Sequence, residues 1–278
     1  MKKIFILFST ILVAMMIISC SNNSIIETLN DNVEITEIVE TTTQTETTEK
    51  ILFDQNITFT CKYISNNETM PYALYTPSTA SDHEAIPLII WLHGSGERGV
   101  GEKVFLNQGL PNALSNWTLE GFNAYILCPQ LIGKWNSDSW NNNNSKENLQ
   151  TLIDKFIEEH NIDINNIIIS GHSLGGQGAL YMAHQLPEYF SKVVVLSGYH
   201  PRIDIEEIAI PTIGYVGMSN TGEDHASIYY MHGDFADVFG EESVFDIKSS
   251  HGSLPLTAFN EDKDSNNRSD IIEWMLLN

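Results

Sequence analysis

The residue best suited to chemistry is Ser173, which lies in a Gly-x-Ser-x-Gly pentapeptide between an apolar run and a helix-forming segment. The β-branched run at residues 167–169 predicts a strand, and residues 178–183 predict a helix directly after the pentapeptide. A tight turn between them would strain Ser173 and lift its hydroxyl clear of the sheet, as in a nucleophile elbow. Gly171 and Gly175 fit this turn because a Cβ there would collide with the neighbouring strand and helix. Ser173 is therefore our candidate nucleophile.

A serine hydroxyl is a weak nucleophile until a base removes its proton, so a histidine is needed nearby. His251 lies between the apolar run at residues 244–247 and the helical pattern at residues 270–277. In the chain order nucleophile, acid, histidine, the histidine follows the last strand. We expect His251 to be the general base and later the acid for the leaving group.

The third group would be a carboxylate that fixes the tautomer of the histidine and stabilises the imidazolium. It should follow the strand predicted at residues 212–216. Asp224 is the first choice and Glu223 the second. Asp234 and Asp237 lie further along, in or beyond the next helix, and fit less well.

The oxyanion formed on attack needs preorganised N–H donors. One would be the backbone N–H of Leu174, at the start of the helix after Ser173. The second should come from the glycine-rich loop at residues 93–99, which follows a continuous apolar run. We assign it to Ser95, with Gly94 as the alternative.

The elements that must position these residues begin with a hairpin and continue as regular alternation of strands and helices. Such alternation predicts an α/β fold with a mostly parallel sheet covered by helices on both faces. The count is eight strands, at residues 57–64, 70–76, 88–92, 124–128, 167–169, 193–196, 212–216 and 244–247.

Four motifs together resemble a known family: Met-Pro-Tyr-Ala-Leu-Tyr at 70–75, Leu-His-Gly-Ser-Gly-Glu-Arg-Gly at 92–99, Cys-Pro-Gln at 128–130 and Gly-His-Ser-Leu-Gly-Gly at 171–176. The chain resembles the α/β-hydrolase esterases, and among them the esterase/peptidase branch related to feruloyl esterases and polyhydroxybutyrate depolymerases. The resemblance implies the α/β-hydrolase fold and a Ser-His-Asp serine carboxylic-ester hydrolase that forms an acyl-enzyme and requires no cofactor. The chain differs from this family at the triad acid. Relatives commonly carry Gly-x-x-Asp, whereas six residues separate Gly217 from Asp224 here.

The expected substrates are small molecules with short-chain or carbohydrate-linked esters. Trp135 and Trp140 flank a polar loop at the carboxyl end of a predicted strand. They could bind a sugar or phenolic group as an aromatic wall, or simply pack against the rim. A serine peptidase of the same fold, or an inactive binding protein that keeps the fold, are the alternative functions.

Six residues between positions 262 and 273 have the spacing of the ligands in an EF-hand-type calcium loop. Asn267 stands where glycine is usual, and asparagine tolerates the left-handed conformation. A bound calcium would be structural, holding the segment between His251 and the last helix. An acidic solvated loop is the alternative. The six candidate ligands are Asp262, Asp264, Asn266, Arg268, Asp270 and Glu273.

The N-terminus carries targeting signals. Two lysines and a short apolar run precede Ile-Ile-Ser-Cys, which resembles the processing site of bacterial lipoproteins. This implies that residues 1–19 are a signal peptide and that Cys20 is lipidated. Residues 20–50 are rich in Thr and Glu and predict a disordered acidic tether. Residues 51–278 then form the catalytic domain, anchored to the cell envelope outside the cytoplasm, with the lipid as its only membrane contact.

The formal net charge of −22 argues against nucleic-acid binding, which needs basic patches. Two cysteines remain after lipidation. Cys61 lies on the first predicted strand and Cys128 on the fourth, with the second strand between them, too far apart for a disulfide. We expect two free, largely buried thiols.

Overall fold

The computed structural model describes residues 52–277 except for 55, 66–68, 82, 100, 102–108, 116–120, 134–138, 200–202, 219–230 and 262–269. All described residues belong to one compact unit, residues 49–278. No helix within these described ranges is both long and apolar enough to cross a membrane.

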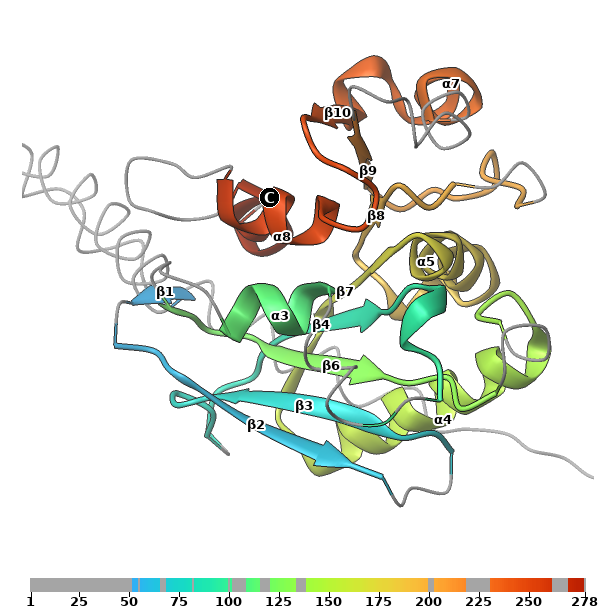
Figure 1. Cartoon of the computed structure of the whole chain (residues 1–278). Coiled ribbons are helices and arrows are strands. Elements are labelled where there is room, and N and C mark those ends of the chain that lie inside the picture. The colour runs from blue at the N-terminus through green and yellow to red at the C-terminus, as the bar shows by residue number, and fades with distance from the viewer. Residues whose placement is uncertain are drawn as a thin grey trace, which may run out of the picture. The chain divides into compact units, whose positions relative to one another are not determined.

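An eight-stranded sheet forms the centre, in the order β10-β9-β8-β7-β4-β6-β3-β2, with β2 and β3 at one edge and β10 at the other (Figure 1). Strands β4 and β6 to β10 pair in parallel, whereas β2, β3 and β6 pair antiparallel. This confirms the predicted hairpin and mostly parallel sheet. The strands are β2 (Phe59–Ile64), β3 (Tyr72–Pro77), β4 (Ile86–Leu92), β6 (Tyr125–Pro129), β7 (Ile162–His172), β8 (Lys192–Leu196), β9 (Thr212–Gly217) and β10 (Val244–Ile247).

Helices cover both faces of the sheet (Figure 1). Every residue of β4 is buried, as expected for a parallel strand covered on both sides. Its residues Leu88, Ile90 and Leu92 belong to one core cluster, with α4 (Asn143–Glu159) and α5 (Leu174–Gln185). The alternate residues Ile89 and Trp91 belong to the other, with α3 (Gly109–Ser115), α8 (Leu254–Glu261) and α9 (Asp270–Leu277).

Short elements complete the described chain. A separate antiparallel pair joins β1 (Phe53–Asp54) to β5 (Gly121–Phe122). The short helical turns are η1 (Ser95–Glu97), η2 (Pro187–Tyr189), η3 (Met231–Phe235), α7 (Ala236–Phe239) and η4 (Glu241–Ser243). Of these, η1 directly follows β4 and lies at the candidate site.

Neither of the two described cysteines forms a disulfide, and β3 lies between their strands as predicted. Cys128 is buried, but Cys61 is exposed, so the prediction of two buried thiols is wrong for Cys61. The reason is that β2 is the edge strand, and the middle of it faces solvent.

Candidate active site

Ser173 occupies a strained turn between β7 and α5. Its backbone has φ 56° and ψ −115°, and of the described residues other than glycine only Ser197 also has a positive φ. Such conformations cost about 1–3 kcal/mol and persist only where the surroundings enforce them. Here the Ser173 N–H donates to Leu196 O at 2.9 Å. The strained backbone predicted for the nucleophile elbow is confirmed.

The glycines on either side of Ser173 allow β4, β7 and α5 to approach closely. A Cβ on Gly175 would lie 1.8 Å from the carbonyl oxygen of Leu92. A Cβ on Gly171 would lie 2.4 Å from the carbonyl carbon of Gly175. The predicted collisions therefore hold, and the turn requires glycine at both positions.

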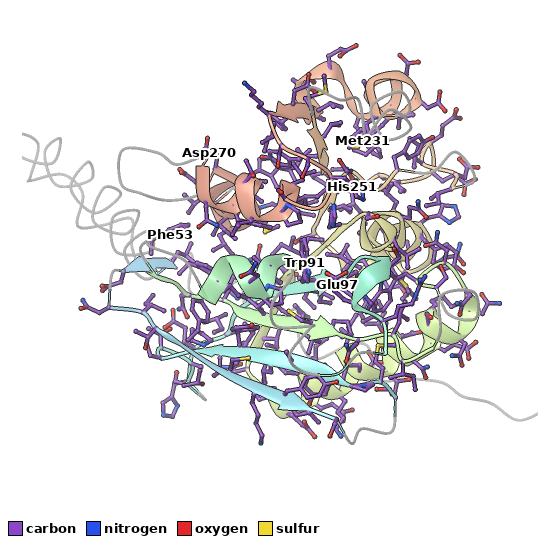
Figure 2. All side chains as sticks on the ribbon, viewed as in Figure 1. Phe53, Trp91, Glu97, Met231, His251 and Asp270 are labelled. Carbon is purple, nitrogen blue, oxygen red and sulfur yellow. The ribbon has the colours of Figure 1, made fainter. Side chains whose placement is uncertain are left out.

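A cavity of about 360 Å³ opens beside Ser173 and is lined by residues from segments far apart in the sequence. Figure 2 shows Glu97 on the turn that follows β4 and His251 on the connection that leads into α8. Both line this cavity together with Ser173, Ser95 and His172. The fold thus brings the predicted nucleophile, base and oxyanion loop to one site.

The connection from β10 to α8 holds His251 in a closed turn. Ser253 N and Leu254 N both donate to Ser250 O, at 3.1 and 3.0 Å. The His251 ring packs against His172, with 4.6 Å between ring centroids and 43° between planes. His172 is the residue before Ser173, so this contact connects the predicted base directly to the elbow.

The acid candidates Asp224 and Glu223 lie outside the described residues. The connection that carries them begins beside the His251 turn, because Met218 N donates to Ile247 O at 2.7 Å. A Cβ on Gly217 would lie 3.1 Å from Ser249 O. The end of β9 and the start of the His251 turn are therefore neighbours.

Asp234 and Asp237 line a different cavity, of about 480 Å³, together with Tyr199. The Tyr199 hydroxyl is 3.4 Å from Asp234 Oδ2. Neither carboxylate is among the described residues around Ser173.

The predicted oxyanion loop, residues 93–99, is held in place by His93. Its Nε2 accepts the N–H of Leu131 at 3.0 Å. The proton is therefore on Nδ1, which donates to Gly94 O at 2.6 Å. Burial, with a smaller contribution from the Arg98 charge, lowers the His93 pKa to about 4, against the opposing effect of the Gly94 hydrogen bond. The ring is neutral at pH 7 and links the loop to the segment after β6.

The predicted donors Leu174 and Ser95 are the first residues of α5 and η1. The first N–H groups of a helix have no partner within it. Both therefore stand where a backbone N–H can serve a ligand.

The expectation of an aromatic wall is wrong for Trp140. Its side chain is 0 % exposed, and its Nε1–H donates to His93 O at 3.0 Å. A Cβ on Gly178 of α5 would lie 2.4 Å from Trp140 Cβ. Trp140 therefore packs beneath the oxyanion loop and supports it, and it offers no surface to a substrate. Trp135 lies outside the described residues.

Glu97 is a member of the site that the sequence did not single out. Its side chain lines the cavity yet is only 5 % exposed. Burial raises the pKa of its carboxyl group, and hydrogen bonds from the backbone N–H groups of Glu97 and Gly94 oppose this rise. Gln130 Nε2 donates to Glu97 O at 2.9 Å. The available sequence signal was a glutamate three residues after a glycine. At this spacing a glutamate can accept the backbone N–H of the residue that begins a helical turn.

Most of the predicted calcium loop lies outside the described residues. Residues 262–269, with four of the six candidate ligands, lie outside the described part of the chain, as does Cys20. Asp270 and Glu273 lie in the first turn of α9. Among the described residues, no group of three or more His, Cys, Asp or Glu could hold a metal ion.

Comparison with known proteins gives three findings. An esterase family model, described as "Putative esterase", matches residues 64–252. No curated protein matches the sequence. Among solved structures, a thermostable esterase aligns with a TM-score of 0.51 and 22% identity over 78% of this chain. Substrate-bound FphF, a fluorophosphonate-binding serine hydrolase of Staphylococcus aureus, aligns with a TM-score of 0.51 and 13% identity over 80% of this chain.

The chain spans 59% of the length of the thermostable esterase and 99% of FphF. At these identities, both structures support the fold alone. The family match covers more than half of the 278 residues. The protein therefore belongs to this esterase family and has the α/β-hydrolase fold.

Proposed function

We propose that the protein is a serine carboxylic-ester hydrolase that uses Ser173, His251 and Asp224. The observation that carries this proposal is the strained Ser173 turn, which shares one cavity with His251 and the oxyanion loop. Membership of the esterase family supports it independently.

The reaction would proceed in two halves. Ser173 Oγ attacks the ester carbonyl carbon while His251 takes the hydroxyl proton. The tetrahedral intermediate then expels the alcohol, which receives that proton from His251, and an acyl-enzyme remains. Water then attacks the acyl-enzyme while His251 takes its proton. The acyl group leaves as a carboxylic acid, and His251 returns the proton to Ser173 Oγ. Asp224 would hold the His251 ring in the tautomer that can accept the serine proton. The reaction requires no cofactor.

The negative charge on the intermediate would be stabilised by the N–H groups of Leu174 and Ser95. Removing one such donor costs about 3–4 kcal/mol of transition-state stabilisation in serine hydrolases. Because these donors belong to backbone held by β4, β7 and α5, they need no reorganisation during the reaction.

The cavity volume supports small substrates. At about 360 Å³ it lies near the lower end of small-molecule sites. We propose short-chain or carbohydrate-linked esters, with Trp135 as a residue that binds the sugar or phenolic group.

Hydrolysis of p-nitrophenyl acetate tests the function. We expect a burst of p-nitrophenol from the wild type, none from Ser173→Ala, and a wild-type burst from Ser81→Ala, which removes an exposed serine hydroxyl. A parallel assay with a peptide p-nitroanilide should show no turnover. Cleavage of the anilide alone would make the protein a peptidase. Folded wild type without either activity would indicate a binding protein.

We also propose that Cys20 carries a lipid that anchors the domain outside the cytoplasm through the tether. Metabolic labelling with a palmitate analogue should mark the wild type and not Cys20→Ser. Equal labelling of both would reject the anchor.

A structural calcium at residues 262–273 is proposed on the ligand spacing alone. Millimolar calcium should raise the Tm of chelator-treated protein by several degrees, and should not do so in Asp264→Asn. An unchanged Tm in the wild type would remove the site.

A further inference from the structure

Glu97 is a buried carboxyl group in the cavity that the chemistry above does not use. It is the third residue of η1, and Gly94 is the N-cap of that turn. A glutamate at the third position that accepts the N-cap N–H is half of a capping box. Here the carboxylate accepts hydrogen bonds from the N–H groups of Gly94 and of Glu97.

The Gly94 backbone is thereby held at both ends. Its carbonyl oxygen accepts from His93 Nδ1 at 2.6 Å, and its N–H donates to Glu97. The space is tight, since a Cβ on Gly94 would lie 3.1 Å from Glu97 Oε2. Two contacts from opposite sides fix the orientation of the turn that follows Gly94.

This arrangement favours Ser95 over Gly94 as the second donor to the oxyanion. The Gly94 N–H is already used by Glu97. Ser95 is the first residue of η1 and lines the cavity with Ser173. Its N–H is one of those that a helical turn does not itself use.

The main chain of Glu97 is anchored as well. Gln130 Nε2 donates to Glu97 O, and the Tyr63 hydroxyl donates to Gln130 Oε1 at 2.5 Å. The Gly99 N–H donates to Leu131 O at 2.8 Å. These hydrogen bonds hold η1 to the segment after β6. The backbone that carries the Glu97 side chain is therefore fixed.

We propose that Glu97 is a positioning residue of the oxyanion hole: by accepting the Gly94 N–H it fixes η1 so that the Ser95 N–H serves the oxyanion. The proposal rests on the proposed ester hydrolysis. A free carboxylate beside a developing oxyanion would oppose the reaction. In this turn two N–H donors share its charge and hold it against the Gly94 backbone.

Kinetics of Glu97→Ala, Glu97→Gln and the control Glu241→Ala test this proposal. Glu241 is an exposed glutamate that begins another short helical turn, η4. Each protein is labelled to completion with a fluorophosphonate, and kcat is expressed per labelled site. A merely structural role would reduce the number of sites without changing kcat at each.

We expect Glu97→Ala to lower kcat per site by about tenfold or more and to leave KM within about twofold of the wild type. The reason is that the oxyanion forms only in the transition state and the tetrahedral intermediate, and not in the bound substrate. The Ki of an alkyl boronic acid, which forms a tetrahedral adduct, should rise by a similar factor. Glu97→Gln should keep kcat within about threefold because its amide oxygen still accepts the Gly94 N–H, and Glu241→Ala should match the wild type.

Wild-type kcat per site in Glu97→Ala, or a Glu97→Gln as impaired as Glu97→Ala, would overturn the positioning role. If Glu97→Ala does not fold, Gly94→Ala decides, since its methyl displaces the same carboxylate. A severalfold lower kcat at unchanged KM supports the proposal, and an unchanged kcat overturns it. Failure of the proposed function itself would differ, because the wild type would then not hydrolyse esters.

Discussion

The imidazole rings of His172 and His251 lie 4.6 Å apart between centroids, inclined by 43°. His172 belongs to the elbow, next to the proposed nucleophile, and His251 belongs to the turn before α8. The His172 ring therefore limits the movement of the proposed base. His172 is 8 % exposed, and it is held on a strand end whose backbone is fixed by its pairing with β8. The His251 ring therefore takes its orientation from β7 as well as from its own turn.

Replacing His172 tests this packing. We expect His172→Phe to keep kcat/KM within about threefold because a ring still packs against His251. His172→Ala should lower kcat/KM by about tenfold or more, since a loosened base loses the alignment on which proton transfer depends. Ester hydrolysis by equal amounts of fluorophosphonate-labelled sites measures both. An alanine variant as active as the phenylalanine variant would contradict the packing role.

His93 should make the stability of the fold depend on pH. Its folded pKa of about 4 lies below the 6.5 of an exposed histidine. Between these values the unfolded chain binds the proton and the folded protein does not. The free energy of unfolding should therefore fall as the pH decreases from about 6.5 to about 4. The loss from this group is about 3 kcal/mol at most.

Denaturant unfolding at pH 7, 5.5 and 4 measures this effect, with His93→Gln as the matched variant. The variant is less stable at pH 7 because it cannot reproduce both ring hydrogen bonds. It should also lose less stability on acidification than the wild type. Parallel curves for the two proteins would show that His93 does not carry the pH dependence.

Trp140→Phe tests whether the indole supports the oxyanion loop. The substitution leaves the His93 carbonyl without its indole donor, and an unsatisfied buried acceptor costs about 1–3 kcal/mol. The free energy of unfolding should fall by that amount, while KM for phenyl and alkyl esters stays within about twofold. A selective rise in KM for aryl esters would instead indicate that Trp140 contacts substrate.

The identity of the acid can be read from two variants. Asp224→Asn should lower kcat by about 10⁴-fold, because the amide favours the wrong tautomer of His251. Glu223→Gln should remain within about threefold. The reverse result would assign the acid to Glu223, and two active variants would exclude both.

Local patterns made much of the fold predictable. The eight strands and the hairpin follow from apolar periodicity, and the Ser173 turn follows from a local Gly-x-Ser-x-Gly pattern between a strand and a helix. β7 begins at Ile162, earlier than predicted. The reason is that the register with β4 shifts between the Ile86–Ile162 and Leu88–Ile167 pairs, where polar residues hide the strand pattern. The two-residue strands β1 and β5 are too short to show any pattern.

Burial was harder to predict because it depends on partners far away in sequence. Glu97 reads as a surface charge, and most glutamates are exposed. Its carboxylate is buried with the N–H groups of Gly94 and Glu97 as donors. These groups come within its reach only when residues 94–97 form a turn. Trp140 reads as a loop residue, yet β4 and α5 enclose it. The exposure of Cys61 follows from the strand order, which places β2 at the edge.

The site of covalent labelling shows whether Ser173 is the nucleophile. The native protein is treated with a fluorophosphonate, digested and mapped by mass spectrometry. We predict one adduct per chain, on Ser173, lost in Ser173→Ala and slowed in His251→Ala. An adduct on another residue, or an unlabelled protein that still hydrolyses esters, would show that Ser173 is not the nucleophile.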